Sequence, residues 1–359
     1  MNPLLKLKSL GQSIWLDNLS RTLLREGGLT RLVEQDGVSG VTSNPTIFFK
    51  AISESPYYKD ELQRLRTDTS LTAEQRYEAL AIPDIQAACD VLRPQYEQTA
   101  GNDGYVSLEV SPALAHDAAG TVAAALRLRA AISRPNLLIK VPATAAGVKA
   151  IEELIGSGCS VNVTLMFSLD HVRDVAKAYI EGLKKWVRSG GDPRAVKSVA
   201  SLFLSRVDTL VDKRLDGLGG SALPLRGKTG VALAKLAYEE YKKIFRGPLF
   251  AELSARGARP QYLLWASTGT KNPAYSDVMY VEPLIGPETV NTLPDGTLAA
   301  FRDHGRAELT LERDTAAARD QFVALARLEV EMGRVGQQLQ EEGLKLFEQS
   351  FVELLKLMA

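Results

Sequence analysis

The chain has 359 residues, of which 45% are hydrophobic and 24% charged, a composition typical of a globular protein with a large core. Basic and acidic residues are equal in number, 43 of each, so no nucleic acid or strongly charged partner is expected. The two cysteines have no metal-binding or redox spacing, and we find neither a signal peptide nor a long apolar run. We therefore expect a cytoplasmic protein that makes no contact with membranes.

Short apolar or β-branched segments alternate along the chain with segments of helical periodicity, which predicts an α/β fold. One helix is expected to begin at Ser111-Pro112 and extend to Ile132, because serine caps helices and proline fits their first turn. Another is expected over Leu169–Val187, capped by Ser168. The eight segments expected to be strands are Ser13–Asn18, Gly40–Ser43, Tyr105–Val110, Leu137–Val141, Val161–Phe167, Val199–Leu204, Gln261–Ser267 and Val281–Ile285.

Eight strands alternating with helices can form a closed (β/α)8 TIM barrel or an open doubly wound sheet. An open sheet that binds dinucleotides has a glycine-rich turn after its first strand, whereas here Asp17-Asn18-Leu19-Ser20-Arg21 contains no glycine. We therefore predict a TIM barrel over residues 1–305.

The remaining residues, 306–359, are expected to form a long amphipathic helical extension, packed on the barrel so that the chain is a single domain. A change of phase at Gly343 predicts a bend in this helix. The same apolar stripe would equally serve a contact between subunits, so a monomer and a homodimer are both compatible with it. Its apolar positions are Leu325, Leu328, Met332, Val335 and Leu339, followed by Leu344, Phe347, Phe351, Leu354 and Met358.

Lys140 is the most informative residue, because it lies within the apolar strand segment Asn136–Pro142. A buried ammonium must pair with a carboxylate or lose its proton, since an isolated buried charge is very costly. A neutral amine can attack a carbonyl group and form a Schiff base. The alternative is a lysine that extends to water from the end of the strand.

Polar side chains gather near the carboxyl ends of the predicted strands, where TIM-barrel enzymes carry their active sites. Each residue taken singly could be an incidental core or rim group, but so many at one end are hard to explain by packing. Asn162 and Thr164 are two apart on one strand and therefore face the same side. The full set is Asp17, Asn44, Glu109, Lys140, Asn162, Thr164, Ser201 and Ser267.

Six ordered motifs resemble those of the transaldolase family, and the resemblance extends from about Ser13 to Gly286. It implies a (β/α)8 barrel in which the lysine at Lys140 forms a Schiff base with a ketose phosphate. The family transfers a dihydroxyacetone unit from a ketose phosphate to an aldose phosphate, without a metal or organic cofactor. The motifs are Trp15-Leu16-Asp17-Asn18, Thr42-Ser43-Asn44-Pro45-Thr46, Val106-Ser107-Leu108-Glu109-Val110, Leu138-Ile139-Lys140-Val141-Pro142-Ala143-Thr144, Asn162-Val163-Thr164-Leu165-Met166-Phe167-Ser168 and Ser201-Leu202-Phe203-Leu204-Ser205-Arg206.

The resemblance also implies roles for the carboxylates. Asp17 matches the base that takes the proton of the substrate's C4 hydroxyl, and the iminium on Lys140 accepts the electrons of the broken carbon–carbon bond. Glu109 is placed to transfer protons during imine formation, through a water held by Thr164; the alternative is that Glu109 only forms an ion pair with the lysine. The residues expected to hold substrate hydroxyls are Asn44, Asn162 and Ser201.

The expected phosphate site departs from the family pattern. Arg206 and Ser267 match the family's arginine and serine, but Gly269 stands where a second arginine is usual. Lys271, two residues further on, is expected to supply the missing charge, although a lysine cannot form the two-pronged contact of a guanidinium. The alternative is that Lys271 is a solvated loop residue.

Three other functions are weighed against transaldolase. A fructose 6-phosphate aldolase would carry Gln at Glu109 and Tyr at Phe203, so both residues favour a transaldolase, with Phe203 in the substrate site. A metal-dependent sugar aldolase or isomerase is disfavoured, because no histidine ends a predicted strand. A non-catalytic sugar-phosphate-binding barrel would not need a lysine and two carboxylates around one point.

Overall fold

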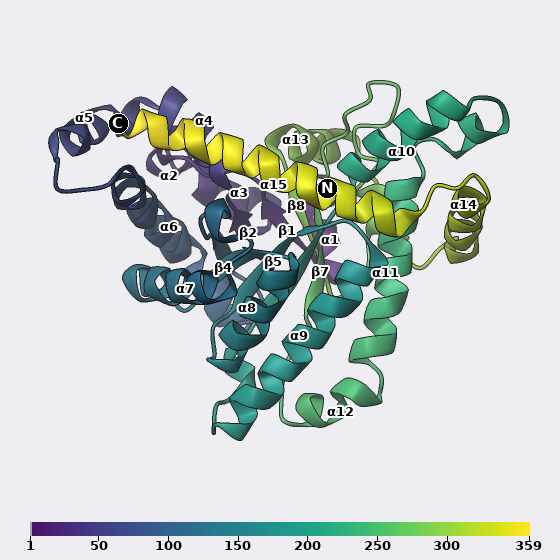
Figure 1. Ribbon diagram of the computed structural model, residues 1–359, viewed down its shortest axis with the longest axis horizontal. Helices are drawn as coiled ribbons and strands as arrows, with labels where there is room; N and C mark the ends of the chain where they lie inside the picture. The colour runs from purple at the N-terminus through teal and green to yellow at the C-terminus, as the bar shows by residue number, and fades with distance from the viewer. Residues whose placement is uncertain (1) are drawn as a thin grey trace.

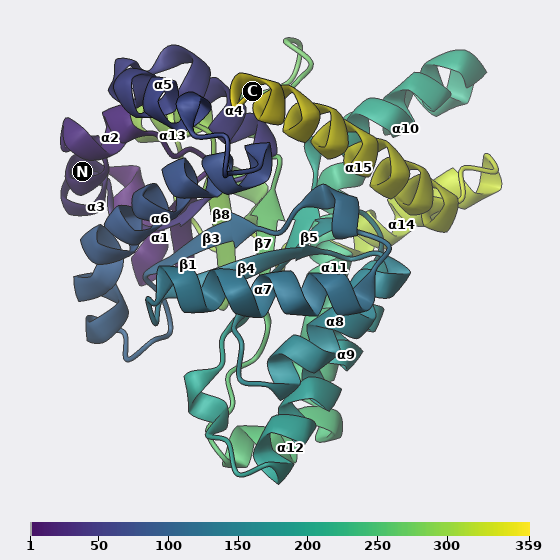
Figure 2. The ribbon, with the colours of Figure 1, turned by 60° about the vertical axis from the view of Figure 1, so that its left-hand side comes forward.

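The computed structural model describes residues 2–359, which form a closed barrel of parallel strands surrounded by helices (Figures 1 and 2). Each strand pairs with the next along the chain, and β1 pairs with β8 to close the barrel. This confirms the predicted (β/α)8 fold. The strands are β1 (Gln12–Leu16), β2 (Val38–Thr42), β3 (Tyr105–Glu109), β4 (Leu137–Pro142), β5 (Val161–Met166), β6 (Ser198–Phe203), β7 (Tyr262–Ala266) and β8 (Thr289–Leu293).

Helices follow the strands and cover the outside of the barrel. The α-helices are α1 (Pro3–Ser9), α2 (Arg21–Arg25), α3 (Gly28–Asp36), α4 (Pro45–Glu54), α5 (Lys59–Thr67), α6 (Ala73–Gln98), α7 (Ala118–Ile132), α8 (Ala145–Gly156), α9 (Leu169–Arg188), α10 (Ser205–Leu218), α11 (Thr229–Phe245), α12 (Pro248–Ala255), α13 (Asp295–His304), α14 (Thr315–Arg327) and α15 (Met332–Leu357). The short 3-10 helices are η1 (Pro56–Tyr58), η2 (Pro112–Leu114), η3 (Pro193–Ala195), η4 (Gly220–Leu225) and η5 (Glu282–Leu284).

The strands are buried along nearly their whole length, as expected of parallel strands that are covered on both faces. Trp15 on β1 packs its ring over Gly40 on β2, where a Cβ atom would lie 2.4 Å from the ring, so the contact requires glycine. The Trp15 indole donates a hydrogen bond of 2.9 Å to Asp103. This anchors β1, and with it the residue that follows the strand, Asp17.

The eighth strand was predicted wrongly. Val281–Ile285 contains the 3-10 helix η5, and the strand that closes the barrel is Thr289–Leu293. The apolar side chains of the first segment are buried, which explains its strand-like pattern, but Pro283 lies within it and lacks the N–H that a central strand needs. The true strand is rich in threonine and therefore less apolar.

The two helix starts had different outcomes. Ser168 caps α9 by accepting a hydrogen bond from the backbone N–H of His171, as predicted. Ser111-Pro112 was wrong as the start of the next helix: it opens only the 3-10 helix η2, and α7 begins at Ala118. Asp117 caps α7 instead, by accepting from the backbone N–H of Gly120.

The C-terminal helical extension is present, but it does not bend at Gly343. The chain forms two helices, α14 and α15, and the break between them lies at residues 328–331, where Glu329 has a φ of 59°. Gly343 lies inside α15, where a Cβ atom would be 3.0 Å from Leu165, so its small size serves close packing. The sequence pattern marked a contact, not a bend.

Helix α15 lies across the carboxyl ends of the strands, from α14 at one side to α5 at the other (Figure 1). Gln340 on this helix donates hydrogen bonds to the backbone carbonyls of Ala143 and Leu165, which follow β4 and belong to β5. The backbone carbonyls of Leu357 and Met358, at the carboxyl end of α15, accept hydrogen bonds of 2.8 Å from Arg66 and Arg76. These bonds attach α15 to the barrel through Gln340 and to the segment of Arg66 and Arg76 at its carboxyl end.

No helix among residues 2–359 combines the length and the apolar character that crossing a membrane requires.

We expect Gly147→Ala to destabilise the protein by about 1–3 kcal/mol, the usual cost of overpacking. Gly147 lies in the first turn of α8, and a Cβ atom there would be 1.9 Å from the carbonyl oxygen of Pro142 at the end of β4. Gly217→Ala in α10 is the matched control: nothing lies within 4 Å of its Cβ position, so the helix should gain up to ~1 kcal/mol. Urea unfolding measures both changes, and equal effects would contradict this packing argument.

Candidate active site

A cavity of about 280 Å³ opens at the carboxyl ends of the strands, on the side of the barrel that α15 crosses. Eight of the eleven predicted site residues line this central cavity: Asp17, Asn44, Lys140, Ser201, Phe203, Arg206, Ser267 and Lys271. The other residues around it are Thr42, Thr46, Ile47, Ala266, Gly269, Thr292, Pro294 and Phe347.

Lys140 lies within β4 and is 4% exposed, so its amine is withdrawn from water as the sequence predicted. Its Nζ atom donates a hydrogen bond of 3.2 Å to the backbone carbonyl of Ser43, which follows β2. The same atom lies 3.5 Å from Oε2 of Glu109, the residue beside Lys140 on β3. The amine is therefore held between two neighbouring strands and faces the central cavity.

Glu109 is a buried carboxyl with an altered acidity. Burial raises its pKa from 4.5 to about 7, although the positive charge of Lys140 acts in the opposite direction. Its Oε2 atom has no hydrogen-bond partner among residues 2–359, and neither has Oγ1 of Thr164. Thr164 lies beside Pro142 in the register of β4 and β5, so these two free polar atoms flank the strand that carries Lys140. A carboxyl that titrates near neutral pH beside an amine can both donate and accept protons.

Asp17 directly follows β1 and lines the cavity. Thr42 at the end of β2 donates a hydrogen bond of 2.7 Å to its Oδ1 atom, which fixes the carboxylate. Burial raises the pKa of Asp17 above its usual range, while the charge of Lys140 and the bond from Thr42 lower it. The site thus has two carboxyls in different surroundings, an arrangement that suits two different proton transfers.

The predicted hydroxyl-binding residues lie at different depths. Asn44 lines the cavity, and its side-chain oxygen caps α4 by accepting from the backbone N–H of Ile47. Ser201 also lines the cavity, and its hydroxyl donates a hydrogen bond of 2.7 Å to Oδ1 of Asn162. Asn162 is fully buried and donates to Ser107, so it supports Ser201 from below and does not itself line the cavity.

Arg206 lies in the first turn of α10 and lines the cavity together with the ring of Phe203. Its guanidinium lies 5.5 Å from the centre of the Phe203 ring and 5.9 Å from that of Phe347. Burial lowers the pKa of Arg206, and its Nη1 atom has no hydrogen-bond partner within the part of the chain that the structure describes. A buried cation with a free donor is suited to bind an anionic group.

Ser267 and Lys271 lie in the segment that follows β7, and both line the central cavity. The Ser267 hydroxyl is 2.8 Å from that of Ser205, at the start of α10. A Cβ atom at Gly269 would lie at an ordinary contact distance, 3.5 Å, from its nearest neighbour, so packing does not require glycine at this position. Arg206 and Lys271 give the part of the cavity wall that they line two positive charges.

Eight residues that line the cavity were not among the predicted site residues, and three of them show why they were missed. Thr42 belongs to a quoted motif and ends a predicted strand, so its position could have identified it. Thr292 belongs to β8, which was placed too early in the chain, and its hydroxyl is 2.7 Å from that of Thr42. Phe347 is one of several apolar residues on α15, and nothing in its sequence context distinguishes it from the helix's packing residues.

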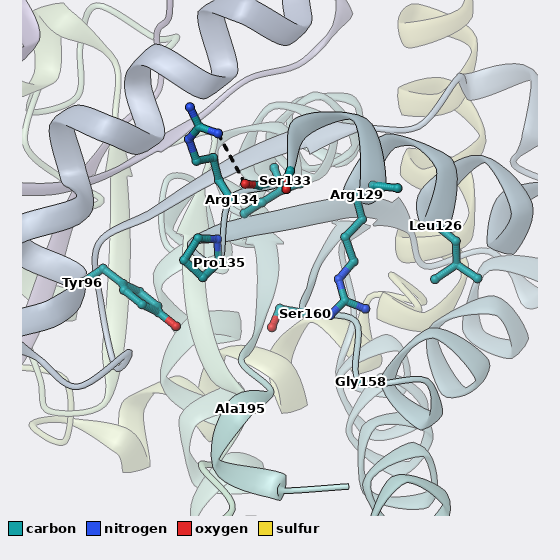
Figure 3. Close-up of a pocket in the computed structure, with 11 residues that line it drawn as sticks. Tyr96, Leu126, Arg129, Ser133, Arg134, Pro135, Gly158, Ser160 and Ala195 are labelled. Carbon is teal, nitrogen blue, oxygen red and sulfur yellow. Dashed lines mark hydrogen bonds between the residues drawn. The ribbon is translucent and has the colours of Figure 1, made fainter.

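A larger hollow, of about 650 Å³, lies at the opposite end of the barrel (Figure 3). Its lining includes Pro135 and Ser160, which precede β4 and β5. Of its two arginines, Arg134 is already paired with Asp90 through bonds of 2.6 and 3.0 Å. This hollow contains none of the predicted site residues and no carboxylate, so it offers no comparable chemistry.

The comparisons with known proteins agree with this geometry. Residues 14–358 match the family model described as transaldolase/fructose-6-phosphate aldolase. The chain is 57% identical to a transaldolase from Thiobacillus denitrificans and 49% identical to one from Neisseria gonorrhoeae, in both cases over 99% of both chains. It is also 47% identical to "Transaldolase 1" of Streptomyces coelicolor, over 98% of this chain and 92% of that one.

The raised pKa of Glu109 gives a prediction about stability. Between about pH 4.5 and 7 the folded chain keeps a proton on Glu109 that the unfolded chain has lost, so the free energy of unfolding falls as the pH rises. Glu109→Gln cannot titrate and should escape this fall, so its stability relative to the wild type should increase by about 3 kcal/mol over that range.

Urea unfolding at a series of pH values measures this difference. Glu353→Gln, on the exposed face of α15, is the control and should run parallel to the wild type. Parallel curves for Glu109→Gln would contradict the raised pKa.

Proposed function

This chain belongs to the transaldolase/fructose-6-phosphate aldolase family and catalyses the transaldolase reaction, and we propose that it does so through a Schiff base on Lys140. The reaction moves a dihydroxyacetone unit from sedoheptulose 7-phosphate or fructose 6-phosphate to glyceraldehyde 3-phosphate or erythrose 4-phosphate, in the non-oxidative pentose phosphate pathway. The observation that carries the proposal is the buried Lys140 amine beside Glu109 at the wall of the central cavity.

Imine formation comes first. The Lys140 amine attacks the ketose carbonyl in its neutral form, and Glu109, whose pKa burial raises to about 7, lies 3.5 Å away with a proton to give. Glu109 then gives its proton to the hydroxyl of the carbinolamine, the C–O bond breaks, and water leaves. The free Oγ1 of Thr164 is available to hold that water beside the carboxyl. The products are the iminium on Lys140, one water and the Glu109 carboxylate.

Cleavage of the C3–C4 bond follows; C3 is bonded to C2, the carbon of the imine. Asp17 takes the proton of the C4 hydroxyl, the C3–C4 bond breaks, and its electrons move into the iminium to give an enamine. The shortened aldose phosphate leaves and the acceptor enters. The enamine attacks the acceptor aldehyde, Asp17 returns its proton to the new hydroxyl, and hydrolysis with Glu109 releases the product from Lys140.

The remaining residues bind the substrate. We assign Asn44 and Ser201 to its hydroxyl groups, with Asn162 acting on Ser201 from below. The aromatic ring of Phe203 bounds the cavity next to Arg206. We assign the phosphate to Arg206, Ser267 and Lys271, because positive charge is concentrated on that side of the cavity. Binding energy from a group that does not react then serves to position the carbonyl against the amine.

We further propose that the chain acts in the cytoplasm, as a single domain in which residues 306–359 cover the barrel of residues 1–305. The two cysteines support a reducing compartment: Cys89 and Cys159 are both free, and burial raises their thiol pKa values to about 12 and about 11.

The test of the proposed mechanism is trapping of the imine. Borohydride added with fructose 6-phosphate should attach the three-carbon unit to Lys140, which mass spectrometry of the peptides detects. Lys140→Arg keeps the charge but cannot form an imine, so both trapping and transfer should be lost while the fold is retained. A folded Lys140→Arg variant with near wild-type turnover would exclude the Schiff base.

The matched control for this test is Asp17→Asn. It should lose transfer by about 10²–10⁴-fold, the usual contribution of an acid–base group, yet still be trapped on Lys140, because Asp17 acts only after the imine has formed. Glu109→Gln should instead slow trapping itself. The reverse pattern would exchange the roles of the two carboxyls.

Lys271→Ala tests the phosphate assignment. It should reduce catalytic efficiency with fructose 6-phosphate and erythrose 4-phosphate by about 10-fold or more, the loss expected for a charge-assisted contact, yet change little for dihydroxyacetone with glyceraldehyde. Lys271→Arg should restore part of the loss. If Lys271→Ala leaves the ratio of the two efficiencies unchanged while Arg206→Ala lowers it, the phosphate is held without Lys271.

A further inference from the structure

The two cations assigned to the phosphate come from different elements. Arg206 belongs to α10, whereas Lys271 belongs to the β7–β8 loop, which we define as residues 267–288. A phosphate bound between them requires a fixed spacing of the two elements. Lys271 is exposed and forms no ion pair among the described residues, so its position depends on how the loop is attached.

Two tyrosines of the loop attach it to α10 through hydrogen bonds to carboxylates. The Tyr275 hydroxyl donates a bond of 2.7 Å to Oδ2 of Asp212, and the Tyr280 hydroxyl donates one of 2.7 Å to Oδ2 of Asp208. The two carboxylates are four residues apart on α10 and therefore lie on one face of the helix. Arg206 lies in the first turn of the same helix, on a different face, so α10 connects the two carboxylates rigidly to Arg206.

Each carboxylate is itself held by backbone donors. Oδ1 of Asp212 accepts from the N–H of Gly227 at 2.9 Å, and Oδ1 of Asp208 accepts from the N–H of Thr229 at 2.8 Å. Gly227 has a φ of 65°, and a Cβ atom there would lie 2.7 Å from the Tyr275 ring, so the ring packs directly against this backbone. The carboxylates are thus fixed acceptors rather than mobile surface groups.

The two tyrosines differ in their surroundings. Tyr280 is 2% exposed and belongs to the buried core, whereas Tyr275 is half-buried. Tyr275 closes the turn that carries Lys271, since its backbone N–H donates to the carbonyl of Asn272 at 3.0 Å. The hydroxyl of Thr270 spans the same turn and donates to the carbonyl of Ser276 at 2.8 Å. Tyr275 is therefore the point at which the Lys271 turn meets α10.

Behind this turn lies a second cavity, of about 270 Å³, between α10 and the loop. Lys271 lines both this cavity and the central one, and Asp208, Asp212 and Tyr275 line the second cavity only. The Lys271 turn therefore has open space on two sides. A turn with so little packing needs a specific bond to hold it in one place.

We propose that Tyr275 and Asp212 are positioning residues for the phosphate of the substrate, because their hydrogen bond holds the Lys271 turn at a fixed distance from Arg206. This inference rests on the proposed phosphate site. Ordering the turn before the substrate arrives removes an entropic cost that binding would otherwise have to meet. The effect should therefore appear with phosphorylated sugars and be absent with sugars that lack the phosphate.

Tyr275→Phe removes only the hydroxyl and keeps the ring on Gly227. We expect KM for fructose 6-phosphate, with erythrose 4-phosphate as acceptor, to rise about three- to tenfold, the range of one hydrogen bond to a charged group that is partly exposed. Turnover of dihydroxyacetone with glyceraldehyde should not change. Tyr57→Phe is the matched control, since Tyr57 also donates to a carboxylate, that of Glu26, but far from the loop, and both activities should stay at the wild-type level.

A double mutant separates positioning from a general loss of structure. In a Lys271→Ala background, Tyr275→Phe should cause no further rise in KM, because the turn then has no charge to position. Asp212→Ala should reproduce the effect of Tyr275→Phe, and the two changes together should not be additive. Additive losses in the Lys271→Ala background, or an equal loss with unphosphorylated sugars, would overturn the proposal.

The outcomes also distinguish this inference from the proposed function. If Lys271→Ala lowers the preference for phosphorylated sugars and Tyr275→Phe does not, the positioning role is wrong and the phosphate site stands. If neither variant changes that preference, the assignment of Lys271 to the phosphate is itself overturned, and the positioning role falls with it.

Discussion

The site depends on one interaction, the ion pair of Lys140 and Glu109 inside the barrel. Burial raises the pKa of Glu109 to about 7, although the positive charge of Lys140 acts in the opposite direction. This carboxyl can therefore give up and regain a proton near neutral pH, directly beside the amine. The neighbouring strands hold the two groups in register, so the barrel itself, not a flexible loop, sets their 3.5 Å separation. A surface pair of the same residues would stay charged and would be useless for imine chemistry.

The rest of the site can be understood as support for that pair. Residues at the ends of other strands take positions around the amine: Asp17 with its donor Thr42 on one side, and Ser201 with Asn162 beneath it on another. Two further positive charges, Arg206 on α10 and Lys271 in the β7–β8 loop, line the same cavity. The amino-terminal end of the barrel, with a larger hollow, has no such grouping. Volume alone therefore does not identify the site; convergence of titratable groups does.

The sequence predicted the parts of this arrangement that local pattern determines. Lys140, Glu109 and Asp17 could be placed because each belongs to or follows a short apolar strand, and strand ends of a parallel barrel meet in space. The closing strand could not be found by apolarity, since it contains two threonines and an asparagine, while the buried segment before it, at Val281–Ile285, is the more hydrophobic of the two. That Phe347 lines the cavity could not be predicted from the sequence for another reason. The direction in which α15 crosses the barrel depends on long-range packing, which residue spacing does not encode.

The path of α15 has a consequence for the order in which the site is completed during synthesis. Phe347 on α15 forms part of the cavity wall. Arg66 and Arg76, from much earlier in the chain, donate hydrogen bonds to backbone carbonyls at the carboxyl end of this helix. Synthesis must therefore pass Phe347 before the wall of the cavity around Lys140 can be complete. A nascent chain that stops before α15 contains all eight strands and both members of the Lys140–Glu109 pair, but it lacks the part of the cavity wall that Phe347 supplies.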